Sequence, residues 1–368
     1  MCFCPSGFRT TNATSFKKCE DINECLQEES CSQLCANYNG GYNCACLSGY
    51  QQVEKKYCKA ISRKDAKIFV TNGDSILITN VEGTVFRAMR RSTLMGRVTA
   101  FDYHNRTGRI YWADRSSKSI YSAYENGTNI VKVANSGITL VEALAVDWIG
   151  QNLYWADYAL QHIEVSRIDG KRRRILFNKN VTNPRPLAID PRAKSRYLFW
   201  TDWGRYPRIE RADLDGTNRI AIITTKLYWP NGLSLDLVRE RVYFADAHLD
   251  YIETCDYFGR NRQQLIANDL MVHHPHSLNL FEDQVYWIDR GHRRLMRMSR
   301  FNTLNKTTIS QVSPQALHVK IAHALLQPNE ENPCARSNCE HLCLLSRNSS
   351  TGYKCQCQMG YLCLLYTS

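Results

Sequence analysis

The sequence predicts an all-β fold, a six-bladed β-propeller flanked by small disulfide-rich modules. Three observations lead to this prediction: a short motif recurs at intervals of 43 to 45 residues, strand-like runs surround each copy, and cysteines gather near both ends of the chain. About forty residues arranged as four short strands make one propeller blade. Six such units need about 260 residues, which matches the cysteine-poor middle of the chain.

The repeated motif combines two bulky residues, usually aromatic, with a smaller residue and an aspartate. An apolar strand precedes each clear copy by about ten residues, and a polar strand with a turn follows it, so each unit contains about four strands. Ile68–Thr71 lies 43 residues before the first clear copy and is a degenerate sixth. The clear copies are Tyr111–Asp114, Tyr154–Asp157, Phe199–Asp202, Tyr243–Asp246 and Tyr286–Asp289.

The first unit lacks one strand, and the end of the repeat region supplies a candidate for it. Ile68–Thr71 has no apolar strand before it, whereas Ala316–Ile321 has that strand's pattern and no blade of its own. We expect Ala316–Ile321 to be the innermost strand of the blade that begins with Ile68–Thr71. Closing the ring in this way leaves no exposed strand edge between its ends.

The repeated residues indicate architecture rather than catalysis. Aromatic side chains that recur in every blade pack between sheets, and a buried aspartate must accept hydrogen bonds, here to hold neighbouring blades together. Some six-bladed propellers are hydrolases that hold a metal over the central channel, but no H-E-x-x-H or G-x-S-x-G motif occurs in this chain. We therefore expect no enzyme activity, and we expect Cys255 to be a buried, reduced thiol.

Cysteine usage indicates an extracellular protein. Of 16 cysteines in 368 residues, only Cys255 lies between Cys58 and Cys334, and no C-x-x-C pair favours a zinc ribbon. The chain opens without a signal-peptide pattern and has no apolar run long enough to span a membrane, so we expect a fragment of a larger extracellular chain. Six N-x-S/T sequons, candidate glycosylation sites, agree with that compartment: Asn12, Asn105, Asn126, Asn180, Asn305 and Asn348.

The formal net charge of +12 is compatible with several kinds of partner. Intracellular proteins with this balance often bind nucleic acid. Because the disulfide context argues against nucleic acid here, we expect the basic run Lys171–Arg174 to lie on a solvated strand-edge face. The alternative is that this run contacts acidic partners or sulfated glycans.

The first cysteine-rich segment has a recognisable spacing, C-x5-C-x3-C-x8-C-x-C-x11-C. A module of about forty residues cannot bury enough apolar surface to fold alone, and cross-links restrict its unfolded chain. Spacing alone leaves many pairings open. The C-x-C pair followed by Ser48-Gly49-Tyr50 makes residues 21–58 resemble an epidermal growth factor (EGF)-like module. That resemblance implies the disulfides Cys25–Cys35, Cys31–Cys44 and Cys46–Cys58.

The same module carries a calcium signature. Calcium takes six to eight oxygen ligands from carboxylates, amides and carbonyls. Asp21 and Glu24 precede or flank the first cysteine of the module, and Asn37 follows the third by two positions, so all three can supply side-chain oxygens. The resemblance to calcium-binding EGF-like modules adds the carbonyls of Ile22, Tyr38 and Gly41. The alternative is an acidic linker beside a metal-free module.

Two incomplete modules of the same kind lie at the ends of the chain. Residues 1–19 resemble the end of an EGF-like module, which implies a Cys4–Cys19 disulfide, and the partner of Cys2 would lie upstream. Residues 334–363 resemble a module without the calcium signature, which implies the disulfides Cys334–Cys343 and Cys339–Cys355. Its ending is abnormal, so a Cys357–Cys363 pair stays open, and we expect residues from about Leu362 onward to be non-native.

The order of modules resembles the low-density lipoprotein receptor family, whose propellers carry Tyr-Trp-Thr-Asp (YWTD) repeats. Segments such as Trp229–Gly232 and Ala245–Leu249 are similar to the large, megalin-like receptor-related members. The resemblance implies an all-β, six-bladed YWTD β-propeller at 62–327 flanked by EGF-like modules. It also implies an endocytic receptor at the cell surface, anchored in the membrane by a segment outside this chain, that releases ligands in acidic endosomes. The alternative is a basement-membrane protein of the nidogen type, which binds a matrix partner.

Three unrepeated residues are the candidate partner-binding site. Trp203 follows the motif of the fourth repeat, Trp229 precedes Pro230, and His274 precedes Pro275. In the family, matching positions lie on the propeller face that contacts the receptor's own acidic ligand-binding modules at acid pH. Two tryptophans in loops favour a hydrophobic anchor for a partner over plain packing. Asp250 stands where the family has a second histidine, so the resemblance implies only one histidine of the pH switch in this chain.

Overall fold

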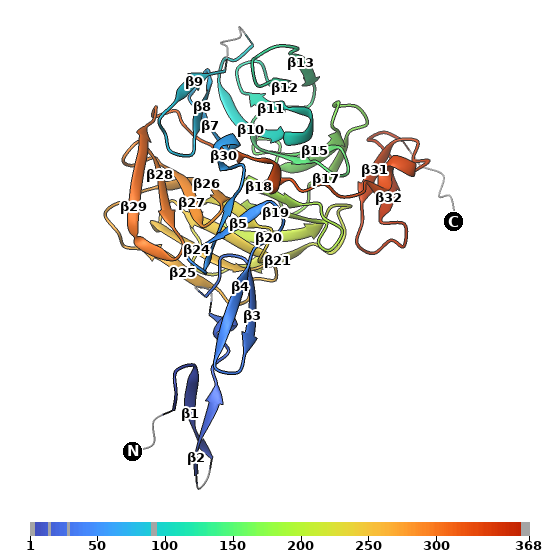
Figure 1. The fold of residues 1–368 in the computed structure, drawn as a ribbon. Helices are drawn as coiled ribbons and strands as arrows, with labels where there is room; N and C mark the ends of the chain where they lie inside the picture. The colour runs from blue at the N-terminus through green and yellow to red at the C-terminus, as the bar shows by residue number, and fades with distance from the viewer. Residues whose placement is uncertain (1–3, 14–15, 28–29, 90–93, 362–368) are drawn as a thin grey trace.

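The computed structural model describes residues 4–13, 16–27, 30–89 and 94–361. In this part of the chain, six four-stranded antiparallel sheets form a ring, and four two-stranded sheets belong to the small modules (Figure 1). The all-β, six-bladed fold predicted from the repeat is confirmed.

Each blade is one antiparallel sheet, numbered here along the chain and given from its inner strand outward. Blade 1 consists of β30 (Val319–Ala322), β7 (Lys67–Thr71), β8 (Ile76–Asn80) and β9 (Phe86–Ala88). Blade 2 consists of β10 (Val98–His104), β11 (Arg109–Asp114), β12 (Ser119–Tyr124) and β13 (Val131–Ala134). Blade 3 consists of β14 (Val141–Asp147), β15 (Asn152–Asp157), β16 (His162–Arg167) and β17 (Arg174–Phe177). Blade 4 consists of β18 (Pro184–Asp190), β19 (Tyr197–Asp202), β20 (Arg208–Asp213) and β21 (Ile220–Ile223). Blade 5 consists of β22 (Pro230–Asp236), β23 (Arg241–Asp246), β24 (Tyr251–Asp256) and β25 (Gln263–Ala267). Blade 6 consists of β26 (Pro275–Phe281), β27 (Gln284–Asp289), β28 (Arg294–Ser299) and β29 (Asn302–Gln311).

The remaining elements are short. The two-stranded sheets pair β1 (Phe8–Ala13) with β2 (Phe16–Asp21), β3 (Leu34–Tyr38) with β4 (Gly41–Ala45), β5 (Tyr50–Val53) with β6 (Tyr57–Ala60), and β31 (Leu342–Leu345) with β32 (Tyr353–Gln356). Single turns of 3-10 helix are η1 (Glu24–Leu26), η2 (Arg63–Asp65), η3 (Asn105–Thr107), η4 (Ala324–Leu326) and η5 (Pro333–Arg336).

The ring closes with strands from both ends of the repeat region. Inner strand β30 pairs with β7 in antiparallel register, with Val319 opposite Val70 and Ile321 opposite Ile68. β30 also lies against β26 of the last blade, and β7 lies against β10 of the second. The predicted closure by Ala316–Ile321 is confirmed.

The core lies between blades and is built from the repeated aromatic residues. Trp112, Trp155, Trp200 and Trp287 are fully buried, each on the second strand of its blade. One apolar cluster joins Phe199 of blade 4 to Phe244 of blade 5, and Cys255 lies in the same cluster. The repeated tryptophans are therefore packing residues.

The repeated aspartates anchor the connections between blades. Each is almost fully buried at the end of a second strand and accepts backbone N–H bonds from the segment that enters its own blade. The donors are Gly96 and Arg97 for Asp114, Thr139 and Leu140 for Asp157, Thr182 and Asn183 for Asp202, Tyr228 for Asp246, and His273 for Asp289. Because these donors lie in loops that arrive from the preceding blade, each carboxylate fixes one blade relative to the next.

Candidate functional site

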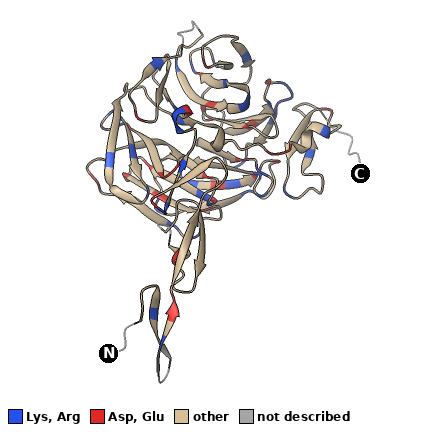
Figure 2. Ribbon diagram, viewed as in Figure 1, with Lys and Arg blue, Asp and Glu red and all other residues tan. Residues whose placement is uncertain are grey.

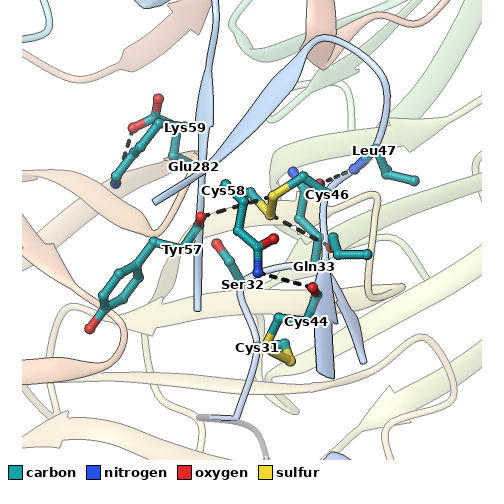
Figure 3. Close-up of a disulfide and its surroundings, with 12 residues drawn as sticks. Cys31, Ser32, Gln33, Cys44, Cys46, Leu47, Tyr57, Cys58, Lys59 and Glu282 are labelled. Atoms are coloured by element: carbon teal, nitrogen blue, oxygen red, sulfur yellow. Dashed lines mark hydrogen bonds and ion pairs between the residues drawn. A yellow bond between two sulfur atoms is a disulfide. The ribbon is translucent and has the colours of Figure 1, made fainter. Parts of the chain in front are cut away.

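The calcium-signature module is docked on the propeller at the end where inner strands finish. Lys59 forms ion pairs with Glu282 at 3.3 Å and Asp283 at 3.7 Å, beside the Cys46–Cys58 disulfide (Figure 3). Buried Arg300 donates to the Ser32 carbonyl at 2.6 Å and to the Asp283 carboxylate at 3.0 Å. The module is thus held by buried, charge-assisted hydrogen bonds, which are stronger than neutral ones.

The last module docks at the same end of the propeller. Leu342, Leu344 and Leu345 of β31 are fully buried in the cluster between blades 3 and 4. Lys354 pairs with Asp215 at 3.0 Å, and Asn152 donates to the Cys343 carbonyl at 3.0 Å. Both modules therefore occupy the end reached by loops between first and second strands, and between third and fourth.

The opposite end carries the three residues singled out from the sequence, and they lie together. The rings of Trp203 and Trp229 are 6.0 Å apart, edge to face, and the rings of Trp229 and His274 are 5.7 Å apart. Each of the three is partly buried. They come from the loop between β19 and β20 and from the loops entering β22 and β26. We call this surface the aromatic face.

Further aromatic residues of the face could not be chosen from the repeat. Tyr228, which is 52% exposed, stacks on His248 with ring centroids 4.1 Å apart, and His248 lies 4.9 Å from Trp229. Tyr158 lies 6.3 Å from Trp203 on the side of blade 3. The signal that could have found them is position in the repeat. Tyr158 and His248 come just after the aspartate of their own motif copies, as Trp203 does, and Tyr228 directly precedes Trp229.

Two neighbouring histidines of the face have shifted pKa values. Burial and the charge of Arg290 lower the pKa of His274. Its neighbour His273 donates from Nδ1 to the Asp250 carboxylate at 3.0 Å, and this hydrogen bond raises the pKa of His273. Asp250 also accepts the backbone N–H of His274 at 2.6 Å. Asp250 therefore pairs with a histidine that the sequence reading missed.

Four of the predicted calcium ligands lie together at the tip of the first complete module: Asp21, Asn37, Tyr38 and Gly41. Asp21 ends β2, and its carboxylate accepts from the Asn37 amide at 2.7 Å and from the Gly40 N–H at 2.6 Å. Tyr38 and Gly41 face each other across the β3–β4 turn beside Asn37.

The negative charge of this tip, and one carboxylate oxygen without a hydrogen-bond partner in the described part of the chain, favour a bound cation. Glu24 Oε2 is buried and has no hydrogen-bond partner among the described residues, and a buried carboxylate oxygen without a partner is costly unless a cation meets it. The described residues contain no cluster of three His, Cys, Asp or Glu side chains that could hold a metal, so a calcium site here must include the Asn37 amide and backbone carbonyls.

Gly7 and Phe8, near the N-terminus of the chain, pack on the tip of the calcium-signature module. The Ile22 N–H donates to the Gly7 carbonyl at 2.8 Å, and the Phe8 ring lies against Gly40. Gly7 has φ near +83°, and a Cβ there would come within 2.5 Å of the Gly40 carbonyl oxygen. Only glycine allows this approach without strain.

The cysteines and sequons have these positions. Cys255 is a buried free thiol whose pKa is raised to about 12 by burial, which makes it a poor nucleophile.

Asn126, Asn180, Asn305 and Asn348 are exposed, Asn105 is partly buried, and the side chain of Asn12 is outside the described residues, as are Cys2 and Cys363. The structure contains the disulfides Cys4–Cys19, Cys25–Cys35, Cys31–Cys44, Cys46–Cys58, Cys334–Cys343 and Cys339–Cys355.

Comparisons with known proteins agree with this arrangement. Residues 151–191 and 196–237 match the family described as low-density lipoprotein receptor repeat class B, and residues 21–58 match the calcium-binding EGF domain. The chain is 34% identical over 373 residues to the vitellogenin receptor Yl of Drosophila melanogaster, an alignment that covers 98% of this chain. The chain belongs to the low-density lipoprotein receptor family.

Other members of the low-density lipoprotein receptor family are similar over shorter or comparable lengths. Low-density lipoprotein receptor-related protein 8 of Gallus gallus is 33% identical over 89% of this chain, and the human low-density lipoprotein receptor-related protein 5-like protein is 35% identical over 40% of it. This chain spans 18% of the Drosophila receptor, 41% of the chicken protein and 57% of the human protein.

Solved structures support the propeller fold. A nidogen–laminin complex contains a chain that superposes with a TM-score of 0.63 at 24% identity, covering 70% of this chain and 98% of that one. TolB from Acinetobacter baumannii superposes with a TM-score of 0.56 at 13% identity, covering 70% of this chain and 66% of its own. At these identities the likeness concerns the fold alone.

Two properties of this receptor-family chain complete the description. No helix among the described residues has the length and apolar character needed to cross a bilayer. Lysine and arginine are spread over the blades and the modules rather than gathered in one block (Figure 2). Within the basic run, Arg173 lies over the Trp155 ring and Arg174 donates to the Cys357 carbonyl at 3.0 Å, so the expected fully solvated face is wrong for these two residues.

Proposed function

We propose that this chain is an extracellular segment of an endocytic cell-surface receptor and that the aromatic face is its partner-binding surface. The observation that carries the proposal is the division of the propeller: both EGF-like modules dock at one end, and the aromatic face lies at the other. Clustered, partly exposed tryptophans are typical hot spots of protein interfaces. The membrane anchor would lie in a segment outside this chain.

The proposed partners are acidic extracellular proteins or the receptor's own acidic ligand-binding modules. Arg185 lies over the Trp203 ring at 4.6 Å from its centroid, which sets a positive charge beside the aromatic cluster. An acidic partner that covers the rings would desolvate Arg185 and His274 together. Protonation of His274 would then add a second positive charge, so we propose that binding tightens as the pH falls and that this exchange supports ligand release in acidic compartments.

The test is binding of a purified acidic ligand-binding module from the same receptor at pH 7.4 and 5.5. We expect tighter binding at pH 5.5. Trp203→Ala and Trp229→Ala should each weaken binding by roughly 2 kcal/mol, and His274→Gln should reduce the pH dependence. Phe258→Ala is the matched control, because Phe258 is 52% exposed and lies in the loop between β24 and β25 at the opposite end. Equal affinity at both pH values would contradict the acid-dependent part of the proposal.

We further propose that Asp21, Glu24 and Asn37, with the carbonyls of Ile22, Tyr38 and Gly41, hold one calcium ion. When bound, calcium would neutralise the two carboxylates and fix the turn that packs against Gly7. The five sequon asparagines with described side chains, and Asn12, are proposed glycosylation sites. The alternative of a nidogen-type matrix protein has support only at the level of the fold.

A further inference from the structure

A ring of six polar residues encircles the propeller axis beside the aromatic face. In blades 2 to 6 they are the second residue of the inner strand, and in blade 1 the residue just before β30, so they come from all six blades. Blades 2, 3 and 5 place theirs as the unpaired residue of a β-bulge, a feature that re-aims a side chain. The ring consists of Thr99, Glu142, Arg185, Asn231, His276 and His318.

The members of this channel ring touch one another. Arg185 lies 3.3 Å from the Asn231 amide oxygen and 3.9 Å from the Glu142 carboxylate. The imidazoles of His276 and His318 lie edge to face with centroids 6.2 Å apart. The charge of Arg185 also acts on both histidines, and His318 meets the Thr99 backbone. The six residues therefore form one polar layer, although their positions in the chain span more than half its length.

The layer has unmet hydrogen-bonding capacity. His276 Nε2, His318 Nε2 and Arg185 Nε are buried and have no partner among the described residues. His276 is 2% exposed and His318 is 7% exposed. Leaving such groups unpaired destabilises the fold unless another group meets them.

The charge of the layer is positive. Arg290, on the loop after β27, and Arg97, before β10, act on the same region, because Arg185 and Arg97 both lower the pKa of Arg290. Against these three arginines the ring offers one carboxylate, Glu142. The buried Arg185 Nε–H, which has no acceptor among the described residues, and the sign of the charge both favour an anion.

We propose that the channel ring binds a carboxylate of the acidic partner and takes up a proton on His276 when it does so. This inference rests on the proposed function, because the aromatic face would bring the partner to the ring: Arg185 belongs to the ring and lies over Trp203. A carboxylate fits the planar guanidinium in two-pronged geometry.

The proton uptake follows from the tautomer of His276. Its Nδ1 lies 2.8 Å from the Leu317 carbonyl, which can only accept, so neutral His276 keeps its proton on Nδ1 and presents a lone pair at Nε2. That lone pair repels an anion, whereas a protonated Nε2 donates to it. The carboxylate and the proton must therefore arrive together.

The groups around the two histidines set the pH range. Burial, Arg185, His318 and Arg290 lower the pKa of His276, and the Leu317 carbonyl opposes them. Burial, Lys320 and Arg185 lower the pKa of His318 to about 3, and the Thr99 backbone opposes them. A bound carboxylate would counter these positive charges and raise the pKa of His276, so affinity should rise as the pH falls.

The test uses the whole chain and a capped synthetic peptide containing Asp-Asp-Asp, with the Asn-Asn-Asn peptide as its neutral counterpart. Calorimetric titration at pH 7.4 and 5.5, at constant ionic strength and in two buffers of different ionisation enthalpy, gives the affinity and the number of protons bound. We expect binding at least ten-fold tighter at pH 5.5, net proton uptake, and no binding of the neutral peptide.

Variants assign the effect to the ring. Arg185→Gln should weaken binding at both pH values at least ten-fold, and His276→Gln should abolish proton uptake. Arg106→Gln, which removes the same charge from an exposed loop at the opposite end, should change nothing. If Arg185→Gln fails to fold by circular dichroism, Arg185→Lys, which keeps the charge but not the planar fork, should still lose affinity.

Each other outcome is decisive. Equal weakening by Arg106→Gln and Arg185→Gln, absent proton uptake, or equal binding of the neutral peptide would overturn the site. Binding of a sulfated disaccharide without binding of the acidic peptide would overturn the carboxylate assignment. If an acidic receptor module fails to bind at either pH while the peptide behaves as expected, the proposed function fails and the anion site stands.

Discussion

Asp157 demonstrates how a single carboxylate of the repeat fixes two loops at once. It is fully buried and accepts backbone N–H bonds from Thr139 and Leu140 before β14, and from Ala159 and Leu160 after β15. One side chain thereby satisfies four backbone donors, from the two loops that meet at this buried carboxylate. This explains why aspartate ends the motif in every clear copy.

We predict that Asp157→Ala destabilises the propeller by at least about 3 kcal/mol, because several buried N–H groups lose their acceptor at once. The matched control is Asp169→Ala, in an exposed turn of the same blade, where the loss should stay below about 1 kcal/mol. Urea unfolding followed by tryptophan fluorescence measures both. Similar midpoints for the two variants would refute the role given to the repeated aspartate.

At the calcium-signature tip, we predict that Asn37→Ala weakens calcium binding, because it removes one of the three proposed side-chain ligands. Only two of these are charged, so the parent affinity should be in the extracellular range of about 10⁻⁴–10⁻³ M. Asn43→Ala, on exposed β4 of the same module, is the control. The measurement is calorimetric titration of the whole chain with calcium. An Asn37→Ala affinity equal to that of Asn43→Ala would remove Asn37 from the ligand set.

Single residues differ in how far the sequence reveals their role. The repeated tryptophans and aspartates could be interpreted as architectural because they recur once per blade. His273 could not be identified, because its partner Asp250 lies 23 positions earlier and only the fold brings the two together. The depressed pKa of His274 likewise depends on burial and on Arg290, which reaches it from the loop after β27.

At the scale of elements, β30 has the largest structural consequence. It belongs to the C-terminal part of the propeller but completes a blade whose other three strands precede residue 90. The sequence predicted this pairing because one unit lacked a strand and one strand lacked a unit. The β-bulges that carry three of the ring residues were not predictable, since an extra residue in a strand leaves no mark in hydrophobic alternation.

We predict that Ile321→Ala destabilises the chain by about 2–5 kcal/mol, the usual range for large-to-small changes in a core. Ile321 of β30 is 1% exposed and packs in the cluster between blades 1 and 6. Ile220→Ala on outer strand β21, where Ile220 is 43% exposed, should lose less than about 1 kcal/mol. Chemical unfolding and limited proteolysis test this, because weakened closure should expose both β30 and β7 to cleavage. Cleavage confined to one of the two strands would contradict a shared blade.

At the scale of the molecule, the order of modules predicted the family and the fold, whereas the division into two ends required the structure. Nothing in the spacing of cysteines says that both EGF-like modules dock at the same end of the propeller. The channel ring was equally hidden, because its six residues share a position but no residue type. Convergence of unlike side chains from six blades is a property of closure rather than of any single repeat.

The buried histidines of the ring should make the free propeller less stable in acid. Their folded pKa values lie below the value of about 6.5 expected in the unfolded chain, so the unfolded state binds more protons as the pH falls below 6.5. Stability is therefore fully present above that pH and is lost below it. His273, with its raised pKa, acts in the opposite sense, but its side chain is 62% exposed and its pair with Asp250 contributes little.

We predict that lowering the pH from 7.4 to 5.5 in buffer without multivalent anions destabilises the parent by about 1.4 kcal/mol for each of the two histidines. His318→Gln should remove its share of this loss, because glutamine does not titrate. Thermal unfolding at both pH values measures the difference. Adding the Asp-Asp-Asp peptide at pH 5.5 should recover part of the stability, since a carboxylate in the ring makes protonated His276 acceptable inside the fold. A parent whose midpoint is the same at both pH values would show that the two imidazoles are not held neutral by burial, and it would also remove the reason for coupling anion binding to proton uptake.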